Sequence, residues 1–419
     1  MHLTRASIKA SFWLTSYNFI SKGFGLAKAV LLARLLTPTQ FGYWGFVSLS
    51  LNLIETFTET GAESALIQKK DISRSELSAG WTIFLVRSIF ITIVLFLVAP
   101  LIALFFKAPH ITPYIQVIAF TPILRSLRNP ALVLIKKRLE FHKEFLFLSG
   151  GSLVEVVTAI AATSVTRDVW GIVWSIVAGA LAEVILSYLI VKPIIPTKFS
   201  RHEAKDLLNY GKWIWGGSLL SYIITQGDDI VVGKLLGASA LGFYQYAYKI
   251  ASLPATQITG VVTKVTFPAF SIIQDDRKRL QRAFKKTFWL TTVTTSGFSI
   301  LIAIFAYPLV KILLGEQWLS MVPALRILCI FDAIRASSSV YGPLLNAIGK
   351  PQLGTLANLI KAVSMFALIF SFTMKGGIEG TAWANVISSI ITLIIFFSLV
   401  RKTLKNEMSS FAARSKPAS

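Results

Sequence analysis

The sequence predicts an all-α integral membrane protein with about twelve transmembrane helices, and three observations lead to this prediction. Hydrophobic residues make up 54% of the chain and charged residues 15%, whereas a soluble domain carries about 25% charged residues. Apolar runs long enough to cross a bilayer recur along the whole chain. The Lys and Arg residues behind the net charge of +22 lie mostly in short segments between these runs. This charge pattern is typical of membrane orientation, so we expect no nucleic-acid binding.

The predicted spans are runs of about 20 predominantly apolar residues. In chain order they are 11–33, 41–66, 80–106, 113–135, 146–166, 169–191, 213–236, 240–266, 287–310, 323–347, 353–373 and 378–400. Lys22 interrupts the first run and further spans follow it, so we interpret this run as an uncleaved helix and not as a signal peptide. The longest segment between spans, 192–212, leaves no room for a soluble catalytic domain. We therefore expect no enzyme.

The basic residues predict the orientation. With the N-terminus inside, segments on the cytoplasmic side hold 26 Lys and Arg, and outward segments hold 6. Cytoplasmic segments of membrane proteins carry such an excess of Lys and Arg. We therefore predict that both termini are cytoplasmic.

An internal repeat divides the chain. Shifted by 200 residues, Trp13 falls on Trp213 and the segment 34–36 falls on 234–236; at a shift of 210, Arg125 falls on Arg335. Six spans in each half give both halves the same orientation, with a pseudo-two-fold axis along the membrane normal. The predicted organisation is an N-terminal six-helix bundle over residues 1–200, a C-terminal six-helix bundle over residues 201–400 and a basic cytoplasmic tail over residues 401–419.

Ionisable side chains inside the spans are the candidate site. Each costs about 2.5–3.5 kcal/mol at a bilayer centre, so we expect these side chains to face a hydrated interior, pair with one another or reach the membrane surface. The mid-span cations, which we predict to bind an anionic substrate group such as phosphate, are Lys22, Arg125, Lys249, Arg335 and Lys361. Arg87, Lys264 and Arg326 lie nearer span ends, and we expect them to extend to the membrane surface.

The acidic residues in the spans are candidates for ion coupling or for charge pairing, and these are Asp228, Asp229, Asp332 and Glu55. The doubled carboxylate at 228–229 suggests proton exchange, because like charges oppose ionisation of both groups. The alternative is structural pairing, for example of Asp332 with Arg335 or of the doubled carboxylate with Lys28 or Lys249. Both interpretations stay open at this point.

Polar residues and prolines mark individual spans. The tenth span carries Asp332, Arg335, Ser339, Gly342 and Asn346 at intervals of three or four, and the second carries Asn52, Glu55, Glu59 and Glu63, so each predicts a polar helix face. Prolines inside spans, among them Pro122, Pro254 and Pro343, predict interruptions or kinks, because they remove backbone donors.

No catalytic, metal or cofactor motif accompanies these spans. Cys329 is the single cysteine, and the four histidines lie in predicted loops or tails without metal-ligand spacing. The Gly-Gly pairs at 150–151 and 216–217 lack the Lys-Ser/Thr ending of a phosphate-binding loop. We predict no cofactor.

Several segments resemble one family of membrane transporters. These segments are Leu35-Leu36-Thr37-Pro38-Thr39-Gln40-Phe41-Gly42, the run from Asp228 to Gly237, Leu241-Gly242-Phe243-Tyr244, the basic stretch from Lys136 to Phe141, and the run from Leu345 to Pro351. They resemble the polysaccharide-transport (Wzx-type) flippases of the multidrug/oligosaccharidyl-lipid/polysaccharide exporter superfamily. The resemblance covers nearly the whole chain.

The resemblance implies two six-helix bundles and a location in the bacterial inner membrane. It also implies a function, the translocation of undecaprenyl-pyrophosphate-linked oligosaccharides by alternating access for capsule, exopolysaccharide or O-antigen (lipopolysaccharide) synthesis. The implied partners are the lipid-linked oligosaccharide, membrane lipid, and polymerase and assembly proteins. Two alternatives are a cation-coupled multidrug exporter of the same superfamily and a membrane-embedded polysaccharide polymerase or glycosyltransferase. The surplus of mid-span cations argues against the first, and the absence of a large extramembrane segment argues against the second.

Overall fold

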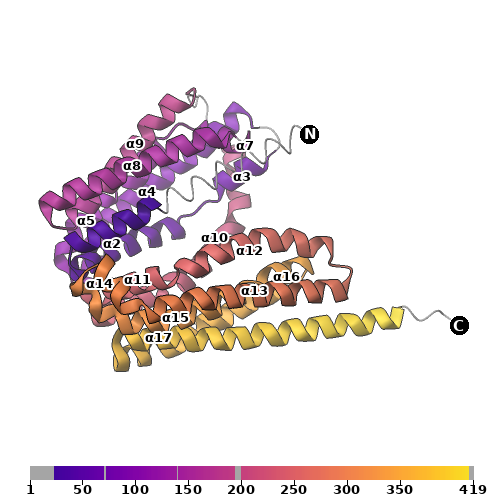
Figure 1. Ribbon diagram of the computed structural model, residues 1–419. Coiled ribbons are helices and arrows are strands. Elements are labelled where there is room, and N and C mark those ends of the chain that lie inside the picture. Colours follow the sequence, from indigo (N-terminus) through magenta and orange to yellow (C-terminus); the bar gives the residue numbers. More distant parts are fainter. Residues whose placement is uncertain (1–22, 70–71, 139, 194–199, 415–419) are drawn as a thin grey trace. The chain divides into compact units, whose positions relative to one another are not determined.

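The computed structural model describes residues 23–69, 72–138, 140–193 and 200–414, and this part of the chain is helical without a strand (Figure 1). Its helices fall into two compact units. Unit 1 comprises residues up to Gln226 together with Gly237–Ser239, and unit 2 comprises Gly227–Leu236 and the chain from Ala240 onward. We describe each unit by itself.

Unit 1 is built from the N-terminal helices. In chain order they are a helix over residues 23–35, α2 (Pro38–Phe57), α3 (Ala62–Gln68), α4 (Arg74–Phe105), η1 (Pro109–Ile111), α5 (Thr112–Ile118), α6 (Thr121–Ser126), α7 (Leu132–Lys137), α8 (Phe141–Thr166), α9 (Trp170–Ile190) and the first part of α10 (Arg201–Leu236). Thr37 with Gln40 and Ser73 with Glu76 form capping boxes at the starts of α2 and α4. These reciprocal bonds satisfy backbone donors that a helix start leaves open.

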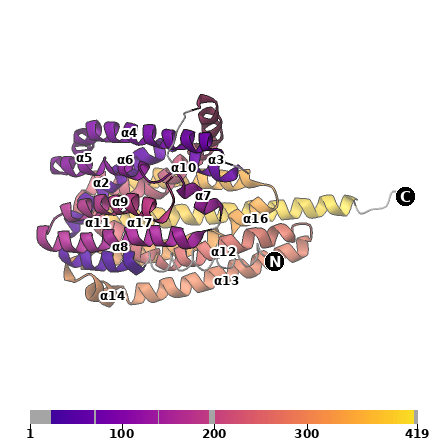
Figure 2. The same cartoon turned by 90° about the horizontal axis from the view of Figure 1, so that it is seen from above.

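Helices α8 and α9 run side by side as a hairpin (Figures 1 and 2). Glycines allow the close approach: a Cβ atom at Gly171 would lie 2.6 Å from the backbone nitrogen of Thr163. Gly151 of α8 similarly packs against the side chain of Glu183, and Gly179 of α9 against that of Glu155. The hairpin therefore packs two partly exposed acidic side chains against glycines.

Unit 2 contains the rest of α10 and the C-terminal helices. These are most of α11 (Ala238–Ala251), then α12 (Leu253–Ile272), α13 (Arg277–Ile304), α14 (Ala306–Leu313), η2 (Glu316–Met321), α15 (Val322–Ser338), α16 (Tyr341–Ala347) and α17 (Pro351–Arg414). An apolar core joins α12, α13, α16 and α17. In it, the rings of Tyr341 and Phe396 stack with their centroids 5.2 Å apart.

Several helices are interrupted where the sequence predicts. Pro122, Pro254 and Pro343 lie in the first turns of α6, α12 and α16, each just after a helix junction. A proline is tolerated in the first turn because the amide hydrogen that it lacks has no partner within the helix there. Within α17, Gly377 has a positive φ of 56° and separates two helices, which correspond to the predicted spans 353–373 and 378–400.

The two predicted polar helix faces have different outcomes. In the second span α2 ends at Phe57 and α3 begins at Ala62, directly after Gly61 with its φ of 62°, so Glu63 does not continue the helix of Glu55. The expectation of one polar face was therefore wrong for the second span. The tenth span divides between α15 and α16, which places Asn346 on a different helix from Asp332. In the tenth span Ser339 and Val340 keep right-handed helical backbone angles between α15 and α16, and Arg335, Ser339 and Gly342 line one pocket.

The described helices are those of a membrane protein. Five of them are long and apolar enough to cross a membrane, and they cover Arg74–Phe105, His142–Thr166, Trp170–Ile190, Arg277–Ile304 and Pro351–Lys402. Large apolar side chains on these helices are exposed, among them Leu97 and Leu104 of α4 and Trp289 of α13. Such a surface suits lipid and not water. The chain is an all-α, multi-pass membrane protein, and the count of twelve spans stays a prediction.

Candidate functional site

A cationic pocket of about 270 Å³ lies within unit 2. Its charged side chains are Arg335 of α15 and Lys361 of α17. The other lining residues are Ser338, Ser339, Gly342, Asn358, Ser389, Thr392 and Phe396. Residues from both sides of the Gly376–Gly377 break in α17 line it, so that break brings the two halves of α17 to one pocket. The pocket therefore combines two cations with several hydroxyl and amide groups, and no carboxylate lines it.

The two cations are positioned by neighbours outside the lining. Arg335 Nε donates to Oδ1 of Asp332 at 2.7 Å, and this aspartate is fully buried. The other carboxylate oxygen of Asp332, Oδ2, is buried without a hydrogen-bond partner. Lys361 Nζ lies 5.5 Å from the centroid of the Phe331 ring, a cation–π contact. The sequence interpretation of Asp332 as a charge partner of Arg335 is therefore observed directly.

A buried polar network lies elsewhere in unit 2. The Tyr244 hydroxyl donates to Asp228 Oδ2 at 2.6 Å, and Asn385 Nδ2 donates to the same oxygen at 3.1 Å. Asn385 Nδ2 also donates to the Tyr244 hydroxyl at 2.9 Å, which closes a triangle. Asp229 accepts a hydrogen bond from Gln245 at 2.9 Å. The doubled carboxylate thus has neutral hydrogen-bond donors, and Tyr244 and Asn385 are functional candidates that the sequence did not single out.

Unit 1 holds a second cavity, of about 350 Å³. Three arginines from α4, α6 and the segment before α7 line it, together with three glutamates: Arg87, Arg125, Arg128, Glu55, Glu63 and Glu144. A neighbouring hollow of about 360 Å³ is also lined by Arg87 and Glu55. Apolar and aromatic side chains, including Trp81, Phe84 and Phe147, complete the wall of the first cavity. This lining mixes positive, negative and aromatic groups.

The three arginines of this cavity are held differently. Arg87 Nη2 donates to the Glu55 carbonyl oxygen at 2.6 Å, so its expected extension to the membrane surface was wrong. Arg128 forms an ion pair with Glu183 of α9 and lies over the Phe147 ring. The Nε atoms of both Arg125 and Arg128 are buried without a hydrogen-bond partner in the described chain. Arg125 differs from Arg128 in that no described carboxylate forms an ion pair with it.

The remaining predicted residues occupy other places. Lys22 lies outside the described residues. Lys249 is exposed on α11, with Nζ 5.7 Å from the Tyr246 ring centroid. Lys28 was a suggested partner of Asp228 and Asp229, but its Nζ forms an ion pair with Glu155 of α8 at 2.6 Å. The structure thus brings Arg335 and Lys361 together and places Arg125 in the cavity of unit 1; a common site for all five cations stays a prediction.

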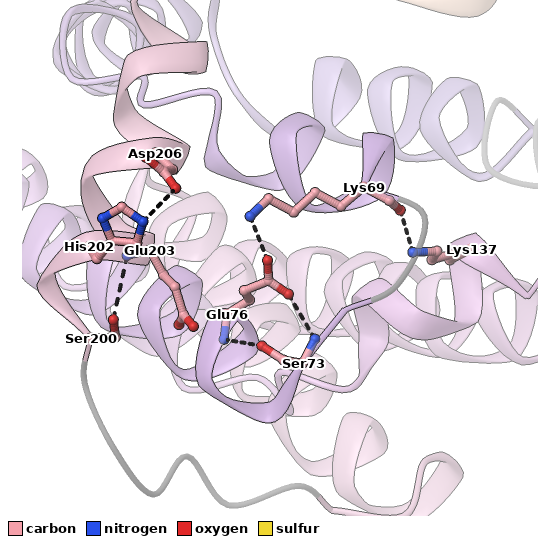
Figure 3. A network of polar contacts seen from close by, with 8 residues as sticks. All are labelled: Lys69, Ser73, Glu76, Lys137, Ser200, His202, Glu203 and Asp206. Atoms are coloured by element: carbon pink, nitrogen blue, oxygen red, sulfur yellow. Dashed lines mark hydrogen bonds and ion pairs between the residues drawn. The ribbon is translucent and has the colours of Figure 1, made fainter.

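A polar network ties together one end of unit 1 (Figure 3). Lys69 Nζ pairs with Glu76 at 2.5 Å, and Lys137 Nζ donates to the Lys69 carbonyl oxygen. The hydrogen bond to Glu76 raises the pKa of Lys69. Nearby, His202 and Asp206 of α10 lie 3.7 Å apart. These contacts fix the ends of α3, α4 and α7 relative to one another, so we interpret the network as structural.

No three His, Cys, Asp or Glu side chains in the described ranges are arranged to hold a metal ion. The chemistry that these three hollows offer is binding through charge and hydrogen bonds.

Comparisons with known proteins agree with this description. A sequence profile described as "Polysaccharide biosynthesis protein" matches residues 31–323. An uncharacterized membrane protein in the cps region of Klebsiella pneumoniae is 29% identical over 416 residues, covering 97% of this chain and 84% of that protein. Lipopolysaccharide biosynthesis protein WzxC of Escherichia coli is 26% identical over 413 residues, covering 96% and 83%.

Solved structures show the same fold. Lipid II flippase MurJ, in an inward closed conformation, matches with a TM-score of 0.75 at 19% identity and covers 92% of this chain and 87% of that chain. An inward-facing multidrug resistance MATE family transporter of the MOP superfamily matches with a TM-score of 0.73 at 15% identity, covering 92% and 96%. The predicted resemblance is thus confirmed, and the chain belongs to the polysaccharide biosynthesis protein family.

Proposed function

We propose that this protein is a transporter that moves a lipid-linked oligosaccharide across the bacterial inner membrane for the synthesis of a cell-surface polysaccharide. Family membership supports the polysaccharide role. The relatives include a succinoglycan biosynthesis transport protein, ExoT of Rhizobium meliloti, which is 23% identical over 362 residues. The helical membrane fold supports translocation, since it contains polar hollows among helices that face lipid.

The observation that carries the proposal is the pocket of Arg335 and Lys361 in unit 2. Arginine and lysine side chains donate hydrogen bonds and accept none, and no carboxylate lines the pocket. A pyrophosphate diester offers acceptor oxygens and negative charge, so its chemistry complements this lining. We therefore propose that undecaprenyl pyrophosphate is the lipid carrier and that its phosphates bind Arg335 and Lys361.

The finer architecture belongs to the same proposal. We propose about twelve spans in two six-helix bundles, over residues 1–200 and 201–400, with a pseudo-two-fold axis and a basic tail over 401–419. Alternating access would then expose the substrate first to the cytoplasm and later to the periplasm. Both termini would be cytoplasmic, and polymerase and assembly proteins would receive the flipped product.

Ion coupling would use the buried carboxylates of unit 2. Asp228 and Asp229 lie in the C-terminal part of α10, and they accept hydrogen bonds from Tyr244, Asn385 and Gln245. Asp332 leaves one carboxylate oxygen without a partner, where a proton or a cation would bind. Glu55 lies in unit 1, and its carbonyl oxygen holds Arg87. If the double variant Asp228→Asn, Asp229→Asn keeps full export with an unchanged pH dependence, these two carboxylates do not couple ions.

The pocket is tested in a host strain that lacks the gene and expresses variants of the full chain. Arg335→Ala should lower export by about tenfold or more, since a charge-assisted contact contributes about 1.5–3 kcal/mol. Arg335→Lys should restore part of it, because charge survives while the planar geometry is lost. The matched control is Arg326→Ala, on the same helix but outside the pocket, where the side chain donates to the Ala303 carbonyl.

Extracellular polysaccharide, membrane-bound repeat units and the membrane abundance of the protein are measured together. The proposal predicts less polysaccharide and more lipid-linked repeat units at normal abundance for Arg335→Ala and Lys361→Ala. A purely structural ion pair would instead lower abundance and activity together, and exchanging Asp332 with Arg335 would restore both. Normal export by the Arg335→Ala, Lys361→Ala double variant would contradict the phosphate site.

A further inference from the structure

Helices α12 and α13 of unit 2 form a hairpin with an exposed basic surface near its turn (Figures 1 and 2). Helix α12 ends at Ile272 and α13 begins at Arg277, so a short turn joins them. We call six exposed basic residues of this hairpin the basic collar: Lys264 of α12 and Lys278, Arg279, Arg282, Lys285 and Lys286 of α13. Within the described chain none of these six side chains forms an ion pair. The collar therefore carries positive charge that the protein leaves uncompensated.

The opposite face of the hairpin fixes the orientation of the collar. Phe270 of α12 and Leu280 and Phe284 of α13 are buried in the apolar core that these helices share with α16 and α17. Residues three or four apart share one face of a helix, so this core occupies a single face of α13. The exposed basic side chains point away from it. The aspartates of the turn do not change this balance, since Asp276 accepts from the backbone nitrogen of Arg279 at 3.0 Å as a helix cap.

Lys264 indicates which environment the collar meets. It is exposed on α12 within one turn of Val261 and Val265, which are 65% and 62% exposed. A lysine on such a lipid-facing surface is unfavourable within the hydrocarbon and extends its ammonium group to the membrane surface. Lys264 lies about two turns before the end of α12, and Lys285 lies about two turns after the start of α13. The two side chains therefore start from a similar depth, close to the headgroups.

Trp289 marks the same boundary on α13. It follows Lys285 and Lys286 by one turn and is 62% exposed, and the next exposed side chains are those of Leu290 and Val293. Tryptophan is enriched at membrane–water interfaces, where its ring lies at the level of the headgroups. From the turn inward, the exposed surface of α13 thus changes from basic to aromatic and then to apolar. A membrane leaflet presents the matching order, with headgroups outside and acyl chains inside.

We propose that the basic collar binds the headgroups of anionic phospholipids of the phosphatidylglycerol class, whose acyl chains lie along the exposed apolar side chains of α12 and α13. The headgroup phosphodiester supplies a negative charge and acceptor oxygens, which lysine and arginine bind through charge-assisted hydrogen bonds. A zwitterionic headgroup carries its own cation, which the collar repels. An acidic protein segment would match the charge of the collar but not the apolar surface that adjoins it. The bound lipid is distinct from the transported molecule, so this inference does not depend on the proposed function.

The test uses the full-length protein in phosphatidylcholine vesicles, with Trp289 as the reporter. Brominated phosphatidylglycerol or brominated phosphatidylcholine is added in increasing proportion, because bromine quenches the fluorescence of a tryptophan that it contacts. Each protein is measured with and without Trp289→Phe, and the difference isolates the signal of Trp289. Brominated phosphatidylglycerol should quench this signal at an about fivefold lower proportion, the factor that one basic residue near the membrane surface contributes. This preference should fall at high salt, because salt screens exposed charges.

Two double variants and a matched control assign the preference to the collar. Lys285→Gln with Lys286→Gln removes the two collar charges nearest Trp289 in the sequence and should lower the preference about fivefold. Lys285→Arg with Lys286→Arg keeps both charges and should retain the preference. The control, Lys107→Gln with Lys375→Gln, removes two exposed cations outside the hairpin and should leave the preference unchanged.

Three results would each overturn the lipid site. The first is equal quenching of Trp289 by the two brominated lipids in the wild-type protein. The second is an unchanged preference in a monodisperse Lys285→Gln, Lys286→Gln protein. The third is an equal loss of preference in the Lys107→Gln, Lys375→Gln control, because net charge and not the collar would then attract the lipid.

Discussion

The triangle of Asp228, Tyr244 and Asn385 allows a sharp prediction of stability. All three residues are buried, with 4%, 0% and 2% of their surfaces exposed. Tyr244→Phe removes the hydroxyl that donates to Asp228 at 2.6 Å and accepts from Asn385 at 2.9 Å. Water cannot replace a partner at a fully buried site, so we expect a loss of about 1–3 kcal/mol in the free energy of unfolding.

A control on the same helix isolates the hydroxyl. Tyr248→Phe removes the same atom from α11, and the Tyr248 hydroxyl makes no hydrogen bond in the described chain. We expect this variant to change stability by less than about 0.5 kcal/mol. Unfolding by SDS in mixed micelles, followed by tryptophan fluorescence, compares the two variants on one scale.

Non-additivity provides a second check. Each side of the triangle is a hydrogen bond, so Tyr244→Phe and Asn385→Leu both disturb the Asp228 carboxyl group. The double variant should therefore differ from the sum of the single variants by about 0.5–3 kcal/mol. Equal losses for Tyr244→Phe and Tyr248→Phe, or strict additivity, would refute the assignment of this network.

Three further predictions concern packing, pH and topology. Gly171→Ala should destabilise the protein by about 1–3 kcal/mol, because the added Cβ would lie 2.6 Å from the Thr163 backbone. Gly260 has open space around it, so Gly260→Ala should not destabilise the protein. Thermal unfolding of the two variants measures the difference. The hydrogen bond from Lys143 lowers the pKa of Glu140 in the folded protein below its unfolded value of 4.5. The pair therefore stabilises the fold at pH values above 4.5, and this stabilisation is lost as the pH falls through the pKa of the folded state. Glu140→Gln should thus reduce the pH dependence of stability over about pH 3–5, by no more than about 0.5 kcal/mol for an exposed pair. A cysteine at Ser239, on a background lacking Cys329, should react with an impermeant reagent added outside; labelling that requires permeabilised membranes would reverse the predicted topology.

The helical class and the helix interruptions could be predicted from the sequence. Apolar runs of membrane length recur along the chain, and some prolines within a run mark a helix junction, whereas Pro100 lies inside α4 without dividing it. Pro254 illustrates such a junction, because α11 ends at Ala251 and α12 starts at Leu253. The bend at Gly61 was missed, since an isolated glycine in an apolar run is compatible with a continuous helix.

The partners of the charged residues could be predicted only where they are close in sequence. Asp332 and Arg335 are three residues apart on one helix, so helical spacing alone suggested their pair. Asp228 and Asn385 are 157 residues apart, and only the fold brings them together. Arg87 was misassigned for the same reason: its acceptor is a backbone carbonyl of another helix, which no side-chain pattern reveals.

The central claim, that the protein flips a pyrophosphate-linked oligosaccharide and uses Arg335 and Lys361 to do so, is tested most directly in proteoliposomes. A fluorescent undecaprenyl-pyrophosphate oligosaccharide is incorporated, and a glycosidase added outside reports how fast the inner-leaflet pool becomes accessible. The account predicts that the wild-type protein and Arg326→Ala expose this pool. It also predicts that Arg335→Ala and Lys361→Ala, reconstituted at equal amounts, slow its exposure by about tenfold or more. The account would be contradicted if the wild-type protein exposed the inner-leaflet pool no faster than protein-free vesicles do. It would also be contradicted if the Arg335→Ala, Lys361→Ala double variant exposed this pool at the wild-type rate.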